Sequence, residues 1–179
     1  NDSGVHISIN LNSASDVVNG GTFNVNNAAA TSNFSTSITV YDSLGEGHTM
    51  SVYFNKTADN TWQWHSLVDG GEVQGGTEGT PVEGGTGTLT FTSSGALQSI
   101  TGTTASFNFT GTAQTIGLNF GQSIADGGTG LDGSTQFSSS TVVNAQSQDG
   151  FSAGSLASVE IDSDGLISGV YSNGRSIPI

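Results

Sequence analysis

The chain has 179 residues, of which only 33% are hydrophobic and 9% are charged, while 27 are glycine. Two basic residues, Lys56 and Arg175, stand against fifteen acidic ones, giving a formal net charge of −13. This balance argues against binding to nucleic acid or to an anionic membrane, which both need many basic side chains, and the lack of cysteine excludes disulfides and thiolate metal sites.

Alternation of apolar and polar residues with a period of two predicts strands along most of the chain. The predicted strands are residues 5–11, 37–41, 50–54, 61–67, 88–91, 107–109, 116–120, 142–143, 159–161 and 166–171. The Ala-rich stretch at 27–30 is too short for an α-helix and is flanked by Asn and Ser. The sequence therefore predicts an all-β protein.

Turn residues separate these strands. Residues 42–47 are Asp-Ser-Leu-Gly-Glu-Gly, which predicts a hairpin loop, because Asp bonds to nearby backbone and Gly adopts positive φ. Residues 93–95 and 162–165 are predicted turns of the same kind. The Gly-rich stretch at 69–87 is predicted to be a long loop or a loose hairpin tip, and 126–134 is a second Gly-rich stretch. Pro81 and Pro178 are expected outside the strands, because proline cannot donate to a sheet ladder.

The pattern predicts an antiparallel β-sandwich or barrel-like domain over residues 1–148 and a partial second small β domain over 149–179. The boundary follows a shift in composition near Asp149. Two strands and a hairpin are too few to form a core, so we expect the second domain to obtain strands from elsewhere. Because the sequence starts at Asn1 and ends abruptly at Ile179, we expect it to be a piece of a longer protein. No apolar run approaches 18 residues, so no membrane-spanning helix is predicted.

A catalytic interpretation of the histidines would pair His48 with Asp42 or Ser43. No activated nucleophile or oxyanion motif accompanies them, so we favour a structural interpretation. In this interpretation His48 opens the strand after the hairpin loop, while His6 and His65 lie on the polar faces of their strands.

Two further sets of residues suggest binding or hydrolysis of sugars. Glu72, Glu78 and Glu83 would supply a pair of carboxylates for glycoside hydrolysis, but they lie in a stretch predicted to be a loop, without a rigid frame. Trp62 and Trp64 share one strand face and would stack on a sugar. Such a pair is more often part of the core, and we predict a core position for both.

The remaining candidate sites are acidic turns, which would bind metal, and N-glycosylation patterns. Residues 162–165 are similar to part of a calcium loop, but the twelfth position is Asn173 rather than the required glutamate, and Asp126 and Asp132 are scattered among glycines. The acceptor pattern for N-glycosylation occurs at Asn33, Asn55 and Asn108, and we assign it no role because it arises readily in a Ser/Thr-rich chain. We predict no catalytic residue, no metal site and no cofactor.

An ordered set of motifs resembles the middle of bacterial flagellar hook proteins. The set is centred on the predicted hairpin at 39–57, with Val-Tyr-Asp-Ser-Leu-Gly at 40–45, His48, Val-Tyr-Phe at 52–54, Lys-Thr at 56–57 and Asn-Thr-Trp at 60–62. Further motifs lie at residues 9–13, 89–91, 95, 97, 136–137, 148–151, 164–165 and 169–174. Their order matches throughout, so the resemblance covers almost the whole chain.

The resemblance implies a structural subunit of the flagellar hook, the curved tube that acts as a universal joint between motor and filament in swimming motility. In such subunits terminal helices form the inner tube, and two β-rich domains lie outside them. Residues 1–148 resemble the outer domain, and residues 149–179 resemble the returning strands of the middle domain. The resemblance further implies secretion to an extracellular place on the bacterial flagellum, in the hook and basal body, and self-assembly with other hook subunits. Hook cap, rod and hook–filament junction proteins are the other implied partners.

Two alternatives stay open at this point. One is an extracellular β-sandwich adhesin or carbohydrate-binding module, which would depend on Trp62 or Trp64 for sugar binding. The other is a related axial component such as the flagellar rod. In either hook or rod, we expect this chain alone to be monomeric, because the helices that drive assembly are missing from it.

Overall fold

The computed structural model describes residues 4–161, 163 and 165–178, and the regular secondary structure in this part of the chain is made of strands and three short 3₁₀ helices. The elements are β1 (Val5–Asn10), η1 (Val18–Gly21), η2 (Val25–Ala30), β2 (Phe34–Tyr41), β3 (Gly47–Ala58), β4 (Thr61–Asp69), η3 (Gly70–Glu72), β5 (Pro81–Phe91), β6 (Leu97–Thr101), β7 (Thr104–Phe107), β8 (Gln114–Asn119), β9 (Val142–Gln148), β10 (Leu156–Ile161), β11 (Ile167–Tyr171) and β12 (Ser176–Pro178). Within the described residues, no helix is long and apolar enough to cross a membrane. The predicted all-β fold is confirmed.

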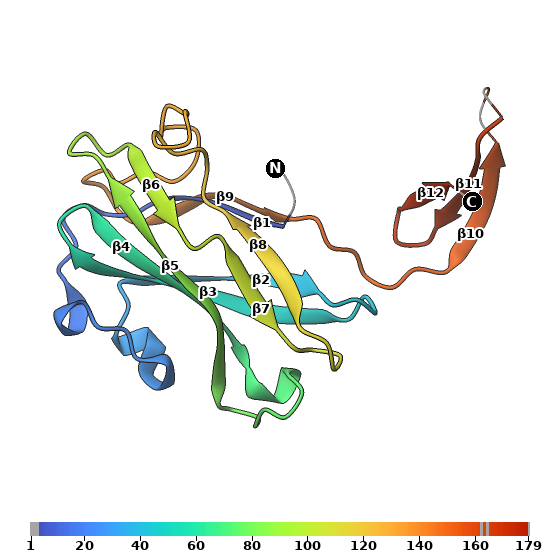
Figure 1. Cartoon of the computed structure of the whole chain (residues 1–179), viewed down its shortest axis with the longest axis horizontal. Helices are drawn as coiled ribbons and strands as arrows, with labels where there is room; N and C mark the ends of the chain where they lie inside the picture. Colours follow the sequence, from blue (N-terminus) through green and yellow to red (C-terminus); the bar gives the residue numbers. More distant parts are fainter. Residues whose placement is uncertain (1–3, 162, 164, 179) are drawn as a thin grey trace.

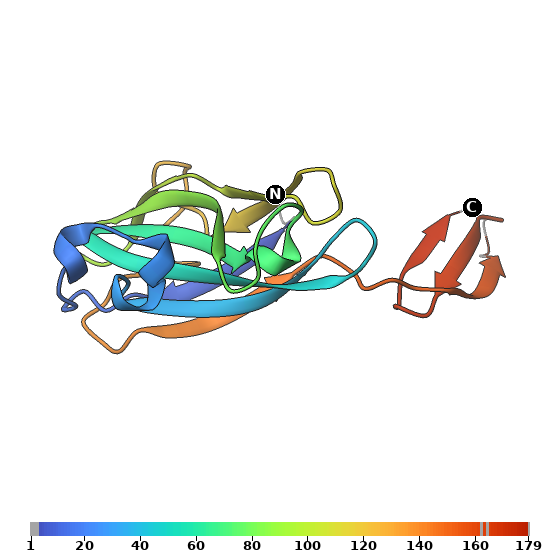
Figure 2. The same cartoon turned by 90° about the horizontal axis from the view of Figure 1, so that it is seen from below.

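Two sheets pack against each other to form the main body (Figures 1 and 2). One has five strands in the order β2-β3-β4-β5-β6, and the other has four strands in the order β7-β8-β1-β9. At one border, Gln146 of β9 bonds to β2, with its Oε1 accepting from Thr36 and its Nε2 donating to the Ser37 carbonyl. The strand pairs are antiparallel except for β1 and β8, where Val5 lies opposite Leu118 in a parallel register.

The predicted hairpin at 39–57 forms as β2 and β3, with Val40 opposite His48. Its inward-facing residues belong to a core that lies between the two sheets. The fully buried large side chains of this core are Trp62, Trp64, Phe54, Phe120, Ile7, Ile9, Leu11, Met50, Leu89 and Leu97. The predicted core position of Trp62 and Trp64 is confirmed, because neither side chain is exposed.

The stretch 69–87 contains the tip of a hairpin, because β4 and β5 pair antiparallel with Asp69 opposite Pro81, but its second half is strand rather than loop. Strand β5 begins at Pro81, and Gly84 and Gly85 lie within it. A Cβ at Gly84 would lie 2.2 Å from the Phe107 ring, and a Cβ at Gly85 would lie 2.4 Å from the Thr104 carbonyl oxygen. These glycines therefore allow β7 to approach β5 closely, a role that composition alone does not separate from that of loop glycines.

Both prolines lie in strands, contrary to expectation. Pro81 is the first residue of β5, and Pro178 belongs to β12, which pairs only with β11 in its sheet. A strand tolerates proline at its first residue or at a sheet edge, because no ladder donor is needed there. Strands β6 and β12 were not predicted, since neither has a clear apolar alternation.

A third sheet of three strands, β10-β11-β12, follows the nine-stranded body and stands apart from it in Figures 1 and 2. In β10, Val159 and Ile161 are 51% and 68% exposed, and they lie opposite Gly169 and Ile167 of β11. One face of this sheet is thus apolar and uncovered. The predicted turn at 162–165 includes Asp162 and Asp164, which lie outside the described residues.

Candidate functional site

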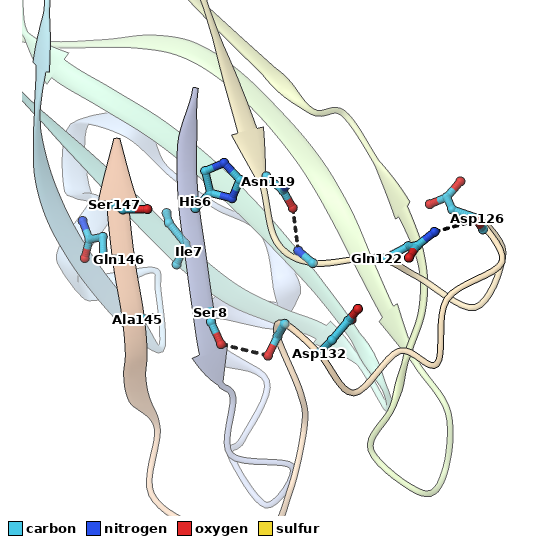
Figure 3. Close-up of a pocket in the computed structure, with 12 residues that line it drawn as sticks. His6, Ile7, Ser8, Asn119, Gln122, Asp126, Asp132, Ala145, Gln146 and Ser147 are labelled. Carbon is cyan, nitrogen blue, oxygen red and sulfur yellow. Dashed lines mark hydrogen bonds between the residues drawn. The ribbon is translucent and has the colours of Figure 1, made fainter. Parts of the chain in front are cut away.

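A hollow of about 820 Å³ lies on the outer face of the four-stranded sheet, where the loop that follows β8 folds over β1 (Figure 3). Several of its polar side chains bond within the protein. Ser8 donates to the Gly133 carbonyl at 2.9 Å, Asn119 accepts from the Gly121 amide at 2.8 Å, and Gln122 donates to the Asp126 carbonyl at 3.2 Å. These bonds hold the loop against the sheet, so they give the hollow a structural explanation.

The acidic residues of this loop do not form a metal centre. The carboxylate of Asp126 accepts a hydrogen bond from Ser123 at 2.6 Å, and Asp132 lines the hollow separately (Figure 3). In residues 4–161, 163 and 165–178, no three His, Cys, Asp or Glu side chains gather as metal ligands would. The calcium-like residues Asp162 and Asp164 lie outside the described residues.

His48 lies at the centre of a buried polar cluster between the hairpin loop and η3. His48 is 8% exposed, and its ring stacks on Phe109, with ring centroids 3.9 Å apart and planes 8° from parallel. Nδ1 lies 3.0 Å from a carboxylate oxygen of Glu72, and Nε2 lies 3.6 Å from a carboxylate oxygen of Asp42. The structure therefore brings Asp42, His48 and Glu72 together, although Asp42 and Glu72 are 30 positions apart in the sequence.

The His48 cluster does not form a nucleophilic site. Ser43, the candidate nucleophile, is exposed, and its Oγ lies 3.3 Å from Thr110 Oγ1 rather than beside His48. The Asp42 carboxylate instead builds the hairpin loop, because it accepts the backbone N–H groups of Leu44 and Glu46, both at 2.8 Å. This bonding is the Asx-type turn that the sequence predicts at residues 42–47.

The pKa of the Asp42 carboxyl is lowered from its ordinary value. Burial acts to raise this pKa, but the backbone N–H groups of Glu46 and Leu44 and the contact with His48 together outweigh it. A carboxyl with a lowered pKa binds protons less readily in the folded than in the unfolded state. Its stabilising effect is therefore present above its unfolded pKa of about 4 and is lost as the pH falls through its folded pKa.

We expect Asp42→Asn to lower the free energy of unfolding at pH 7 by about 1–2 kcal/mol, because a neutral amide accepts the two loop N–H groups less strongly. The difference from the unchanged chain should shrink as the pH falls from about 5 to about 3. Urea unfolding across this pH range measures it. Glu46→Gln, a change of an exposed side chain in the same loop, is the control; a difference for Asp42→Asn that did not vary with pH would contradict the assignment.

His65 forms a second buried pair. It lies on the strand face opposite Trp64, as predicted, but this face is covered rather than exposed. The residue is 7% exposed, and its ring stacks on Phe23 at 3.8 Å between centroids and bonds through Nδ1 to Glu83. Phe23 lies between η1 and η2, and this segment covers the outer face of β4. The alternating pattern of β4 predicts an outward-facing His65, but it cannot show that a distant segment covers that face.

The remaining candidates are also explained by structural roles. Glu72 and Glu83 bond to different histidines, and Glu78 is exposed, so the three glutamates do not form a catalytic pair. Among the glycosylation patterns, Asn55 is fully buried, and Asn33 accepts the Lys56 amide at 2.7 Å. No local sequence pattern predicts the contacts of Phe23 and Phe109 with the histidines.

Comparison with known proteins identifies the family of this chain. A family model described as the D2 domain of the flagellar basal body protein FlaE matches residues 10–151. The chain belongs to this FlaE D2 domain family. The match runs from the last residue of β1 through β9 and ends in the segment before β10.

Curated relatives extend the similarity beyond the FlaE D2 match. The flagellar hook protein FlgE of Helicobacter pylori is 32% identical over 173 residues, which cover 94% of this chain and 23% of that protein. FlgE of Salmonella typhimurium is 35% identical over 170 residues, which cover 92% of this chain and 38% of that protein. The resemblance to flagellar hook proteins is confirmed, and the chain spans well under half the length of these relatives.

A solved structure shares the fold. The 32 kDa fragment of the flagellar hook protein FlgE from Caulobacter crescentus superposes with a TM-score of 0.53 and 16% identity, covering 72% of this chain and 52% of the fragment. At this identity the superposition supports the all-β architecture, while the relation to hook proteins rests on the family match and the curated relatives.

Proposed function

We propose that the chain is a structural part of the bacterial flagellar hook and not an enzyme. The observation that carries this proposal is the alignment of proteins named as flagellar hook proteins over 92–94% of the chain. The clusters around His48 and His65 agree with it, because their carboxylates and rings bond to each other and to the backbone. The role of the domain is then to hold its shape while the hook turns.

Within the hook, residues 1–148 are the outer β domain, and residues 149–179 are part of the middle β domain. The packed body of nine strands, which ends at Gln148, supports this division. The third sheet supports it too, because the apolar face bearing Val159, Ile161 and Ile167 needs further strands to cover it. Those strands belong to the parts of the hook protein that this chain does not span.

Other hook subunits are the principal partners in this proposal, in an extracellular homopolymer. Hook cap, rod and hook–filament junction proteins are the further partners. A surface with few charges and much Ser, Thr, Asn and Gly suits neighbouring outer domains that slide past one another, because small wet contacts do not fix one geometry. The sugar-binding alternative is not favoured, since both Trp62 and Trp64 are fully buried.

Immunogold electron microscopy of isolated hook–basal bodies tests the location. Antibodies raised against the 179-residue chain should label the hook along its length, with the rod and the filament unlabelled. Antibodies against flagellin serve as the control for filament labelling. Label confined to the rod would favour the rod alternative, and label on the cell surface away from flagella would contradict the proposal.

The isolated chain is expected to be a monomer at micromolar concentration. Its net charge of −13 opposes association of copies, and the segments that drive assembly lie in parts of the hook protein outside it. Sedimentation equilibrium should return the mass of one chain, 18.1 kDa, at low and at physiological salt. Stable oligomers at low salt, where repulsion is strongest, would show that this chain carries an assembly contact of its own.

A further inference from the structure

The hairpin loop between β2 and β3 contacts the segment that leads to the third sheet. The Ala153 amide donates to the Gly45 carbonyl at 3.2 Å. Gly45 has a φ of +83°, and a Cβ there would lie 2.3 Å from the Ala153 nitrogen, so the close approach depends on glycine. This contact joins the nine-stranded body directly to the linker at 149–155.

The third sheet also contacts the linker at 149–155. The Asn173 side chain donates to the Ser152 carbonyl at 2.7 Å, and the Arg175 guanidinium lies 4.9 Å from the centroid of the Phe151 ring. The linker is therefore held between the hairpin loop and the turn from β11 to β12. Any shift of the hairpin loop changes the contact between Gly45 and Ala153, which is one of the two contacts that hold the linker.

The position of the hairpin loop depends on Asp42. The carboxylate of Asp42 accepts the Leu44 and Glu46 amides, and its carbonyl oxygen accepts the Gly45 amide at 3.1 Å. The same carboxylate faces His48 Nε2 across 3.6 Å. The loop that supports the linker is thus organised by a group that lies against a titratable ring.

The ring of His48 changes its bonding when it loses a proton. Protonated, it carries N–H on both nitrogens and attracts Glu72 from η3 and Asp42 from the loop; these two carboxylates are its charged contacts among the described residues. Neutral, it keeps one N–H, so the other nitrogen presents a lone pair to a carboxylate. Nε2 is buried and has no hydrogen-bond partner within the described residues. A proton on Nε2 therefore changes the interaction of the ring with the Asp42 carboxylate more than any other contact of the ring.

We propose that His48 is a proton-operated latch on the joint between the nine-stranded body and the third sheet. Protonation of His48 draws the Asp42 carboxylate and its loop toward the ring and strengthens the support of the linker at Gly45. Loss of the proton loosens the loop and frees the linker. The joint is stiffer at mildly acidic pH and looser at mildly alkaline pH, because an imidazole gains and loses its charge across this range.

Nuclear magnetic resonance on the whole chain tests the latch. The His48 ring titration is followed beside the exchange protection of the Ala153 amide, corrected for the intrinsic effect of pH on exchange. Protection of Ala153 should fall about fivefold or more from pH 5.5 to pH 8, the lower end of common coupling between two sites, with the same midpoint as His48. Protection that does not change with pH would overturn the proposal.

Three variants separate the latch from general effects of pH. His48→Gln should make Ala153 protection independent of pH, whereas His65→Gln, which alters a second His–Glu pair away from the loop, should leave the pH dependence intact. Glu72→Gln keeps His48 and removes a carboxylate that stabilises the charged ring, so the midpoints of both His48 and Ala153 should move together to lower pH. A midpoint of Ala153 that stayed in place while that of His48 moved would contradict the latch, even if His48→Gln proved too unstable to study.

Because the chain has no cysteine, spin labels give a second measurement of the same joint. Labels introduced by Ser94→Cys in the body and Ser158→Cys in the third sheet report the distribution of distances between them. The distribution should be narrower at pH 5.5 than at pH 8, and equally broad at both values in the His48→Gln background. A width that does not depend on pH in the unchanged background would count against the proposal.

Discussion

Trp62→Ala should lower the free energy of unfolding by about 3–5 kcal/mol, a large part of the stability of a domain of this size. The side chain is fully buried between the sheets, so its removal leaves a cavity that the neighbouring strands fill only in part. It also removes a hydrogen bond, because Trp62 Nε1 donates to Gln136 Oε1 at 2.7 Å. Urea unfolding followed by circular dichroism measures the loss.

A matched pair of variants separates cavity from hydrogen bond. Trp62→Phe and Trp64→Phe each remove a similar volume from a fully buried ring, but Trp64 Nε1 has no hydrogen-bond partner within the described residues. Trp62→Phe should therefore cost about 1–2 kcal/mol more, because it leaves the buried Gln136 oxygen without its donor. Equal costs would show that the bond to Gln136 contributes no net stability.

Lys56→Met should cost about 2–3 kcal/mol and should release the segment between β1 and η1. The Lys56 side chain is 7% exposed, and its ammonium donates to the carbonyls of Ser13 and Ser15 at 2.7 and 2.9 Å. Methionine has a similar length but offers no donor to these carbonyls. Urea unfolding measures the cost, and faster amide hydrogen exchange at residues 12–18 locates it.

A variant of Asp59, the ion-pair partner of Lys56, is the control for Lys56→Met. Asp59 lies 4.0 Å from the Lys56 ammonium, but its side chain is fully exposed, so Asp59→Asn should leave stability unchanged within error. An effect of Asp59→Asn as large as that of Lys56→Met would assign the role of Lys56 to charge pairing rather than to the backbone bonds.

Local patterns in the sequence predict much of the body, but not what lies over its outer faces. Period-two alternation locates β1, β3, β4 and β8, and it places Trp62 and Trp64 in the core. The same alternation assigns His65 to a polar face, which Phe23 in fact covers. Cover of this kind comes from residues far along the chain, and no local pattern reports it.

Glycine content alone does not distinguish loop glycines from glycines that lie in strands. Gly84 and Gly85 belong to β5 and allow β7 to lie close, whereas Gly45 supports the contact of the hairpin loop with the linker. Both uses arise from packing against distant backbone. The sequence therefore predicts the turn at 42–47, but the pairing of His48 with Glu72 and the stacking on Phe109 depend on the three-dimensional fold.

Electron cryomicroscopy of the hook from the source bacterium tests the central claim most directly. The two packed sheets of residues 4–148 should fit as a rigid unit into the outer layer of every subunit, with the β10–β12 sheet lying in the next layer inward. In that layer further strands of the hook protein should cover the apolar face that bears Val159 and Ile161. A hook whose outer layer has another fold, or whose subunits place residues 4–148 in the inner tube, would contradict the account.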